Sequence, residues 1–281
     1  MTFGINTFLF TSPFTNSSTK LFKKFKAWGF DGVEIAVEDP SHLDAAFVKA
    51  QLDKEGLICT SLCACLPPAR DLRGTRPQQL ATIKYMRQLI DMAEVLGTNL
   101  VAGPVYSAVG RADAVPRAEY RQQWRTVVGH LRTICRYAEE HGKVICLEPL
   151  NRFETDFINT VEQGLKMIRD VKSPALKLLL DTFHMNIEEK NPAEAIRRAG
   201  GHIGHFHASA SDRGTPGNDH VDWKGAAKAL KEIGYTGPIV IESFTTDVKI
   251  IARAAAIWRK IEPDRNDIAS KGVTFLKKTF K

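Results

Sequence analysis

Short apolar runs alternate with longer amphipathic stretches from one end of the chain to the other. Each run is too short for a helix and rich in Val, Ile, Leu or Phe, a composition that predicts a buried strand of a parallel sheet. The eight runs are Phe3–Phe8, Gly32–Val37, Leu57–Cys65, Asn99–Ala102, Val144–Glu148, Leu176–Asp181, Ile203–Ala208 and Pro238–Glu242.

The stretches between the runs repeat apolar residues every three or four positions, which predicts amphipathic helices. One helix is expected to begin at Thr160, because Gln163 completes a capping box three residues later. A last helix is expected to follow Pro263 and to reach about Phe280. Two further repeats are Leu80, Ile83, Met86 and Ile90, and Tyr120, Trp124, Val127 and Leu131.

Eight strands that alternate with helices over 281 residues give roughly 35 residues per unit. No stretch rich in Pro, Gly or Ser divides the chain. We therefore predict an α/β fold, a single (β/α)8 TIM barrel with an extra C-terminal helix, as one domain over residues 1–281. A doubly wound open sheet is the alternative, but its usual glycine-rich turn is missing, since Phe8–Asn16 contains no glycine.

Composition narrows the possible partners. The net charge is +7, but the basic residues are dispersed, and the densest groups have the helical spacing of solvated helix faces. We therefore expect no nucleic-acid partner. No apolar run approaches the ~20 residues of a membrane helix, and the N-terminus lacks the basic region of a signal peptide. We therefore expect no membrane partner. The five cysteines do not suggest a disulfide framework, so we expect a cytoplasmic protein.

Candidate chemistry lies at the ends of four successive predicted strands. These runs end in Glu148, Asp181, His207 and Glu242, which are 33, 26 and 35 residues apart (148 to 181, 181 to 207, 207 to 242). Each separation is about one strand–helix unit, so the four side chains are expected to meet at the carboxyl-terminal rim of the barrel, where such barrels carry their active sites.

A divalent cation explains this set of residues. A buried carboxylate is costly unless it is paired or metal-bound, and three close carboxylates repel one another. Any one of the four could be a structural pairing group, but four on consecutive strands favour a metal site. Three oxygen donors and one imidazole suit Mn²⁺, Mg²⁺ or Co²⁺ better than a structural zinc.

The loops after these strands add polar groups of different chemistry. Glu154, His184 and Arg213 follow the fifth, sixth and seventh runs, and Phe244 after the eighth provides an apolar wall. This mixture suits a substrate with many hydroxyl groups. Cys65, at the end of the third run, is expected to pack, with its thiol at the pocket wall.

Other conspicuous residues have structural interpretations. His205 lies two positions before His207 and is expected to be a hydrogen-bonded core residue one layer deeper. The four tryptophans fall in predicted helical stretches and are expected to pack there: Trp28, Trp124, Trp223 and Trp258.

The segments LEPLNRFET, LDTFHMNIEE, HFHASASDRGTPGNDHVDW and IVIESF resemble the ketose 3-epimerases, the group of D-tagatose, D-allulose (psicose) and L-ribulose 3-epimerases. The resemblance implies an isomerase that acts on a ketose and forms homodimers or homotetramers. It also implies one divalent metal ion per chain, most commonly Mn²⁺ or Co²⁺. Some members carry tryptophans in the loops after the first and fourth strands, where this chain has Phe10, Phe14 and Tyr106.

The resemblance also implies roles for individual residues. The metal ligands would be Glu148, Asp181, His207 and Glu242, and the two glutamates would also transfer the protons. Glu154, His184 and Arg213 would hold the O1 and O2 end of the sugar.

The mechanism expected is proton exchange at C3 through a cis-enediolate. A proton next to the C2 carbonyl is removed and one is returned on the opposite face, while the metal stabilises the negative charge that develops on O2. Glu148 and Glu242 end strands that are not neighbours, so they can act as acid and base from two sides of the substrate.

Several alternatives use the same barrel. An aldose–ketose or inosose isomerase would apply the metal and glutamates at another carbon. An epimerase of a phosphorylated ketose is compatible with Arg213, although the loop SFTTDV has no glycine-rich anion cradle. A DNA-repair endonuclease would need more histidines at the strand ends. A non-catalytic metal-binding barrel would not require the pair Glu148 and Glu242.

Overall fold

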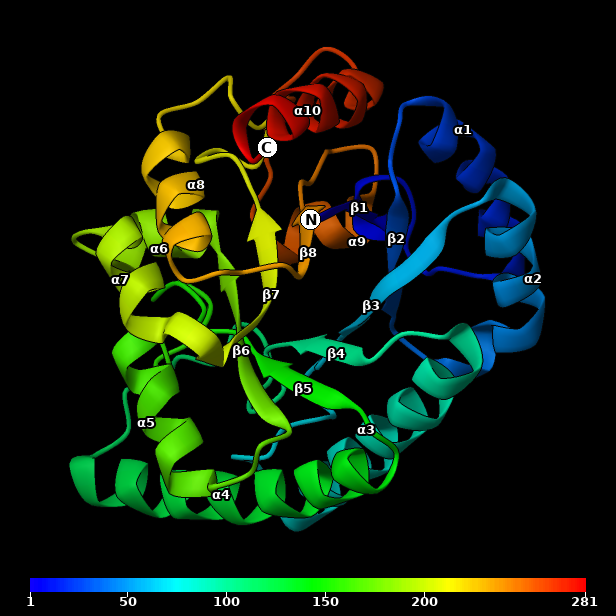
Figure 1. The fold of residues 1–281 in the computed structure, drawn as a ribbon. Helices are drawn as coiled ribbons and strands as arrows, with labels where there is room; N and C mark the ends of the chain where they lie inside the picture. The colour runs from blue at the N-terminus through cyan, green and yellow to red at the C-terminus, as the bar shows by residue number, and fades with distance from the viewer.

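The computed structural model describes residues 1–281 as a closed barrel of eight parallel strands in sequence order. Figure 1 shows the strands surrounded by helices. The strands are β1 (Thr2–Asn6), β2 (Gly32–Val37), β3 (Ile58–Ala64), β4 (Leu100–Gly103), β5 (Val144–Leu147), β6 (Leu176–Asp181), β7 (Ile203–Ala208) and β8 (Pro238–Ile241). The predicted α/β barrel is therefore confirmed.

The helices are α1 (Phe22–Ala27), α2 (Ala45–Glu55), α3 (Arg76–Leu96), α4 (Arg117–Glu140), α5 (Val161–Val171), α6 (Thr182–Glu188), α7 (Pro192–Ala199), α8 (Trp223–Glu232), α9 (Lys249–Ala254) and α10 (Arg265–Thr279). The capping box predicted at Thr160 and Gln163 is present at the start of α5. Helix α10 packs against β1, β8 and α8, and it closes the ring of helices between α8 and α1 (Figure 1).

The strand boundaries agree with the sequence prediction to within one residue, except at the end of β1. The apolar run continues to Phe8, but the strand ends at Asn6. There the Asn6 side chain accepts a hydrogen bond from the backbone N–H of Phe8 (2.9 Å), which starts a short 3₁₀ turn. A side chain that hydrogen-bonds to nearby backbone competes with the sheet ladder, and this ends the strand early.

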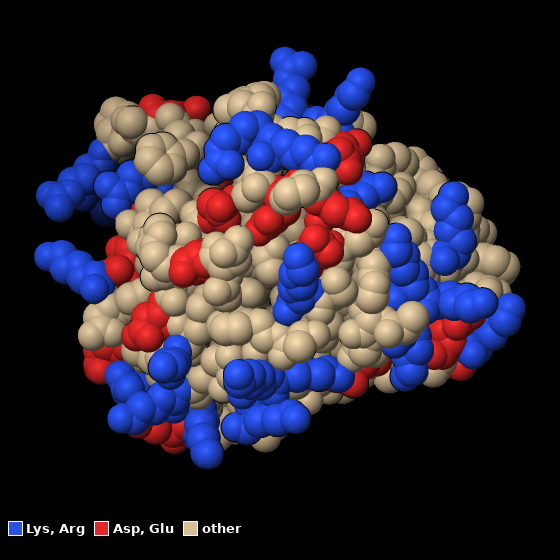
Figure 2. Space-filling model, turned by 90° about the horizontal axis from the view of Figure 1, so that it is seen from above, with Lys and Arg blue, Asp and Glu red and all other residues tan.

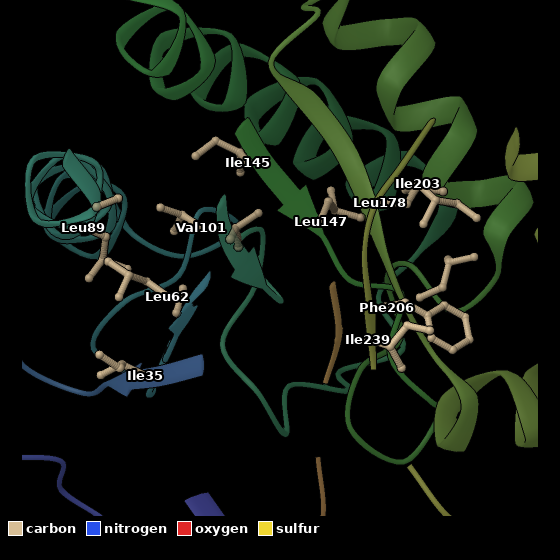
Figure 3. Close-up of a cluster of buried hydrophobic side chains, with 14 of the residues drawn as sticks. Ile35, Leu62, Leu89, Val101, Ile145, Leu147, Leu178, Ile203, Phe206 and Ile239 are labelled. Atoms are coloured by element: carbon tan, nitrogen blue, oxygen red, sulfur yellow. The ribbon is translucent and has the colours of Figure 1, made fainter. Parts of the chain in front are cut away.

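The main core lies between the strands and the surrounding helices. Successive strands contribute large aliphatic side chains to this layer, and Leu89 of α3 lies on the same side as Leu62 and Val101 (Figure 3). One cluster of 69 buried residues includes members of all eight strands, so the core is continuous around the barrel. This continuity holds the strand ends at one rim.

Two surface features bear on the sequence expectations. Lysine and arginine side chains occur in several separate groups among acidic ones on the face shown in Figure 2. Trp258 is 74% exposed and lies in the loop after α9, so the expectation that it packs in a helix is wrong. The apolar spacing of the sequence continues past Ala254, where α9 ends. For this reason the sequence pattern placed Trp258 in a helix. None of the helices combines the length and apolar character needed to cross a membrane.

We predict that Leu62→Ala lowers the free energy of unfolding by about 2–5 kcal/mol, because the buried leucine leaves a cavity between β3 and the helices. Ile58→Ala on the same strand is the matched control. Ile58 is 53% exposed, so its substitution should cost within about 1 kcal/mol. Urea unfolding of both variants measures the difference, and equal losses would contradict the position of this core.

Candidate active site

Four ionisable side chains meet at the carboxyl-terminal rim of the barrel. Glu148 follows β5, Asp181 ends β6, His207 lies near the end of β7, and Glu242 follows β8. All four are buried, and one ligand atom from each lies within 4.8 Å of those of the others. This is the convergence that the strand spacing predicts.

The buried polar atoms of this cluster fit a cation. Nδ1 of His207 lies 3.5 Å from a Glu242 oxygen and 3.9 Å from a Glu148 oxygen. Both His207 Nδ1 and Glu148 Oε1 are buried without a hydrogen-bond partner. Buried polar atoms normally have partners, so two orphans that face each other mark a place for an ion. A cluster of three carboxylates and one imidazole can hold a divalent metal.

The two glutamates differ in their electrostatic surroundings. Burial, followed by repulsion from Glu242, raises the pKa of Glu148 well above its usual value. Burial also disfavours the charged form of Glu242, but the attraction of His207 and of Arg213 outweighs it and lowers its pKa. Two carboxyl groups on one site thus differ in their preference for a proton.

Arg213 provides the largest fixed positive charge in the site. Its Nη1 donates to Asp181 (2.7 Å) and to Glu242 (2.9 Å). The guanidinium lies 4.0 Å from the ring centroid of Phe183 and 4.6 Å from that of Phe244. The residue has a left-handed backbone with φ of 64°, an uncommon conformation for a non-glycine residue. The loop therefore accepts local strain to bring this charge to the carboxylates.

His184 of α6 faces the same cluster as a neutral imidazole. Burial lowers its pKa to about 3. Its Nδ1 accepts a hydrogen bond from the backbone N–H of Asn151 (3.0 Å), and Arg213 Nη2 lies 3.2 Å from its Nε2. That nitrogen lies 3.7 Å from Glu148 and 3.9 Å from Asp181. His184 thus presents Nε2 to the cluster beside Arg213.

Asn151 is a site residue that the sequence reasoning missed. Its side-chain Nδ2 donates to Glu154 Oε1 (2.7 Å), and its backbone holds His184. It therefore orients two predicted substrate-binding residues at once. An asparagine in a polar loop carries little signal by itself, because it serves equally well as a turn residue. Burial of Glu154 raises the pKa of its carboxyl group.

A pocket of about 400 Å³ adjoins the cluster. Glu154 and Arg213 line it on the side of the cluster, and residues 254–259 line it on the other. Phe244 packs edge-on against Phe8, with 6.5 Å between ring centroids, and belongs to a small apolar group with α9. The site therefore has a polar side and an apolar side, as the loop sequences predict.

The remaining residues that the sequence singles out, two cysteines and three aromatic residues, lie outside the four-residue cluster. The Cys65 thiol is 3.7 Å from the Cys63 carbonyl oxygen, and Cys65 is not one of the four residues that meet in the cluster. Cys63, two positions earlier, lies within 4.8 Å of carboxylate oxygens of Glu34 and Glu242. The three aromatic residues of the first and fourth loops are buried packing residues: Phe10, Phe14 and Tyr106.

Glu34 is the second residue that the sequence reasoning missed. It lies on β2 with no solvent exposure, and its carboxylate contacts both His205 (2.6 Å) and His207 (2.8 Å). Burial opposes its charge, but the attraction of the two histidines prevails and holds its pKa well below the usual value. The expectation that His205 is a hydrogen-bonded core residue agrees with this contact. The signal was a single acidic residue within the apolar run GVEIAV.

Comparison with known proteins identifies the relatives of this chain. The model of the xylose isomerase-like TIM barrel family matches residues 22–279. A probable ketose 3-epimerase of Synechocystis sp. is 36% identical over 99% of this chain and 96% of the relative. An L-ribulose 3-epimerase of Methylomonas sp. is 33% identical over 90% and 88%. The crystal structure of D-allulose 3-epimerase from Methylomonas sp. in complex with D-allulose superposes with a TM-score of 0.92 at 30% identity, covering 99% of this chain and 97% of that one.

We predict that Arg213→Met lowers the free energy of unfolding by about 3–5 kcal/mol in buffer with EDTA, because it leaves buried carboxylates without their cation. Arg152→Met is the matched control. Arg152 also pairs with a carboxylate, Glu188, at 2.9 Å, but its side chain is 61% exposed, and its loss should cost about 1 kcal/mol or less. Chemical unfolding compares the two, and similar losses would argue against buried charge balance by Arg213.

Proposed function

This chain belongs to the ketose 3-epimerase family of xylose isomerase-like barrels, and we propose that it is an isomerase that epimerises free ketoses at C3. The observation that carries the proposal is the pair Glu148 and Glu242. They reach one four-residue cluster from β5 and β8, strands that are not neighbours in the barrel. Two carboxyl groups on different sides of one substrate are what inversion at a carbon requires.

The proposed cofactor is one divalent metal ion per chain, with Mn²⁺ preferred and Co²⁺ or Mg²⁺ as alternatives. Its ligands would be Glu148, Asp181, His207 and Glu242, whose donor atoms fit such an ion. When bound, the ion supplies Lewis acidity that stabilises negative charge on the oxygen of the C2 carbonyl.

The residues of the chain would divide the proton transfer between them. One glutamate removes the proton from C3, the substrate passes through a cis-enediolate, and the other glutamate returns a proton to the opposite face. Either glutamate can start, because the reaction runs in both directions between two C3 epimers. Acid–base groups placed in this way each contribute typically about 10²–10⁴-fold to the rate.

Other side chains would orient the sugar. Arg213, His184 and Glu154 present a guanidinium, an imidazole and a carboxyl group to the O1 and O2 end. Phe244 and Cys65 would contribute to the wall for the rest of the ketose. Burial of Arg213 and His184, each 3% exposed, keeps water away and fixes their geometry before the sugar binds.

Self-association and a cytoplasmic location complete the proposal. Phe153 and Trp258 line the pocket beside the site and are 76% and 74% exposed. A second copy of the chain could cover this apolar surface in a homodimer or homotetramer. All five cysteines are unpaired, which suits a reducing compartment.

We expect the Mn²⁺-loaded protein, incubated in D₂O with a panel of free ketoses, to form C3 epimers that carry deuterium at C3. Glu148→Gln and Glu242→Gln should each slow this reaction by about 10²-fold or more at saturating metal. Mass spectrometry and chromatography measure both effects. The control is Glu162→Gln, because Glu162 is an exposed carboxylate that pairs with Arg169 and is not a member of the cluster.

Three outcomes would contradict the proposal. Full activity of Glu242→Gln would remove the two-carboxylate scheme. Epimer without solvent deuterium would exclude proton exchange at C3. Turnover of only a 6-phosphate or an aldose would favour one of the alternative reactions.

We also expect Mn²⁺ or Co²⁺ to raise the melting temperature of EDTA-treated protein, since a ligand at 100 times its Kd stabilises the folded state by about 2.7 kcal/mol. Asp181→Asn should abolish most of this shift. Asp267→Asn is the control, because Asp267 is exposed and pairs only with Lys271 on α10. A thermal shift that persists in Asp181→Asn would place the ion elsewhere.

A further inference from the structure

The carboxylate of Glu34 is fully buried beside the four-residue cluster, and both of its oxygens accept hydrogen bonds. One oxygen, Oε1, accepts from Asn6 Nδ2 (2.6 Å) and from His207 Nε2 (2.8 Å). The other, Oε2, accepts from Ser61 Oγ (2.5 Å) and His205 Nε2 (2.6 Å). Its partners come from β1, β3 and β7, so the carboxylate ties three strands together from inside the barrel.

The contact with His207 determines which ring nitrogen faces the cluster. Because Nε2 is held by its hydrogen bond to Glu34, Nδ1 is the nitrogen left to offer a lone pair to a cation. Nδ1 is the nitrogen that lies near the oxygens of Glu242 and Glu148, and it has no hydrogen-bond partner. The acidic residue on β2 therefore sets the rotation of this ring and the nitrogen that faces the cluster.

A second contact extends from Glu34 to another member of the cluster. The Asn6 amide that donates to Glu34 also lies 3.3 Å from Glu242 Oε1. Asn6 is itself fixed, because its Oδ1 accepts the backbone N–H of Phe8. Glu34 thus acts on His207 directly and on Glu242 through Asn6.

We propose that Glu34 is a positioning residue for the metal site: it holds His207 ready to bind through Nδ1, and through Asn6 it orients Glu242. This inference rests on the proposed metal site described above. A carboxylate behind a ligating imidazole also increases the basicity of the ring, and loss of such a partner typically weakens metal affinity by about 10–100-fold.

The test is Glu34→Gln, which keeps the size of the side chain but replaces one accepting oxygen with a donating NH₂ group. We expect its affinity for Co²⁺ and Mn²⁺, measured by equilibrium dialysis, to fall by about 10–100-fold. The visible absorption of the Co²⁺-loaded variant should shift, because the ligand field of the imidazole changes. Excess Mn²⁺ should restore much of the lost activity.

The matched control is Thr98→Val, which removes another buried hydrogen bond, from Thr98 Oγ1 to the Thr60 carbonyl oxygen, without a contact to His207. Circular dichroism in EDTA checks that both variants fold. Glu34→Gln with wild-type affinity and an unchanged Co²⁺ spectrum would overturn the inference and leave the proposed function intact, as would an equal loss of affinity in Thr98→Val. A wild-type protein that binds neither metal would overturn both.

Discussion

Mutual repulsion among carboxylates in a dry barrel mouth is the constraint on which the rest of this site depends. Glu34, Asp181 and Glu242 are almost fully buried, and charges at such sites interact far more strongly than in water. The barrel compensates them with cations that are equally fixed. Arg213 reaches Asp181 and Glu242 from an unusual backbone conformation, and the ring of His207 lies between Glu34 and Glu242. The strained loop and the paired aromatic rings around Arg213 follow from this need.

The negative charges of Glu148 and Glu242 are compensated to different degrees, and this gives the two carboxyl groups different pKa values. Arg213 donates directly to Glu242, whereas Glu148 keeps one buried oxygen with no partner. The same pair of residue types therefore has different proton affinities within one cavity. Because the two side chains are chemically identical, the difference in their pKa values arises from the neighbouring groups at each strand end.

The sequence predicts the barrel and the four-residue cluster well, because both follow from periodicity. The carboxyl-terminal ends of parallel strands lie at one rim, so the sequence position of a polar residue at the end of a run also gives its place in the barrel. Glu34 and Asn151 lack such a signal. A lone acid inside a strand or an amide in a loop has many uses, and only the packed neighbours show which one applies. Trp258 illustrates the opposite error, since helical spacing continues into a loop where the ring is 74% exposed.

Closure of the barrel has a consequence for how the protein is made. The hydrogen bond from Asn6 to Glu242 joins residues separated by 236 positions, and β1 pairs directly with β8. A chain emerging from the ribosome therefore cannot complete the cluster until almost all of it has been synthesised. Glu242, and the hydrogen bond that it accepts from Asn6, can therefore join the cluster only after β8 has been synthesised.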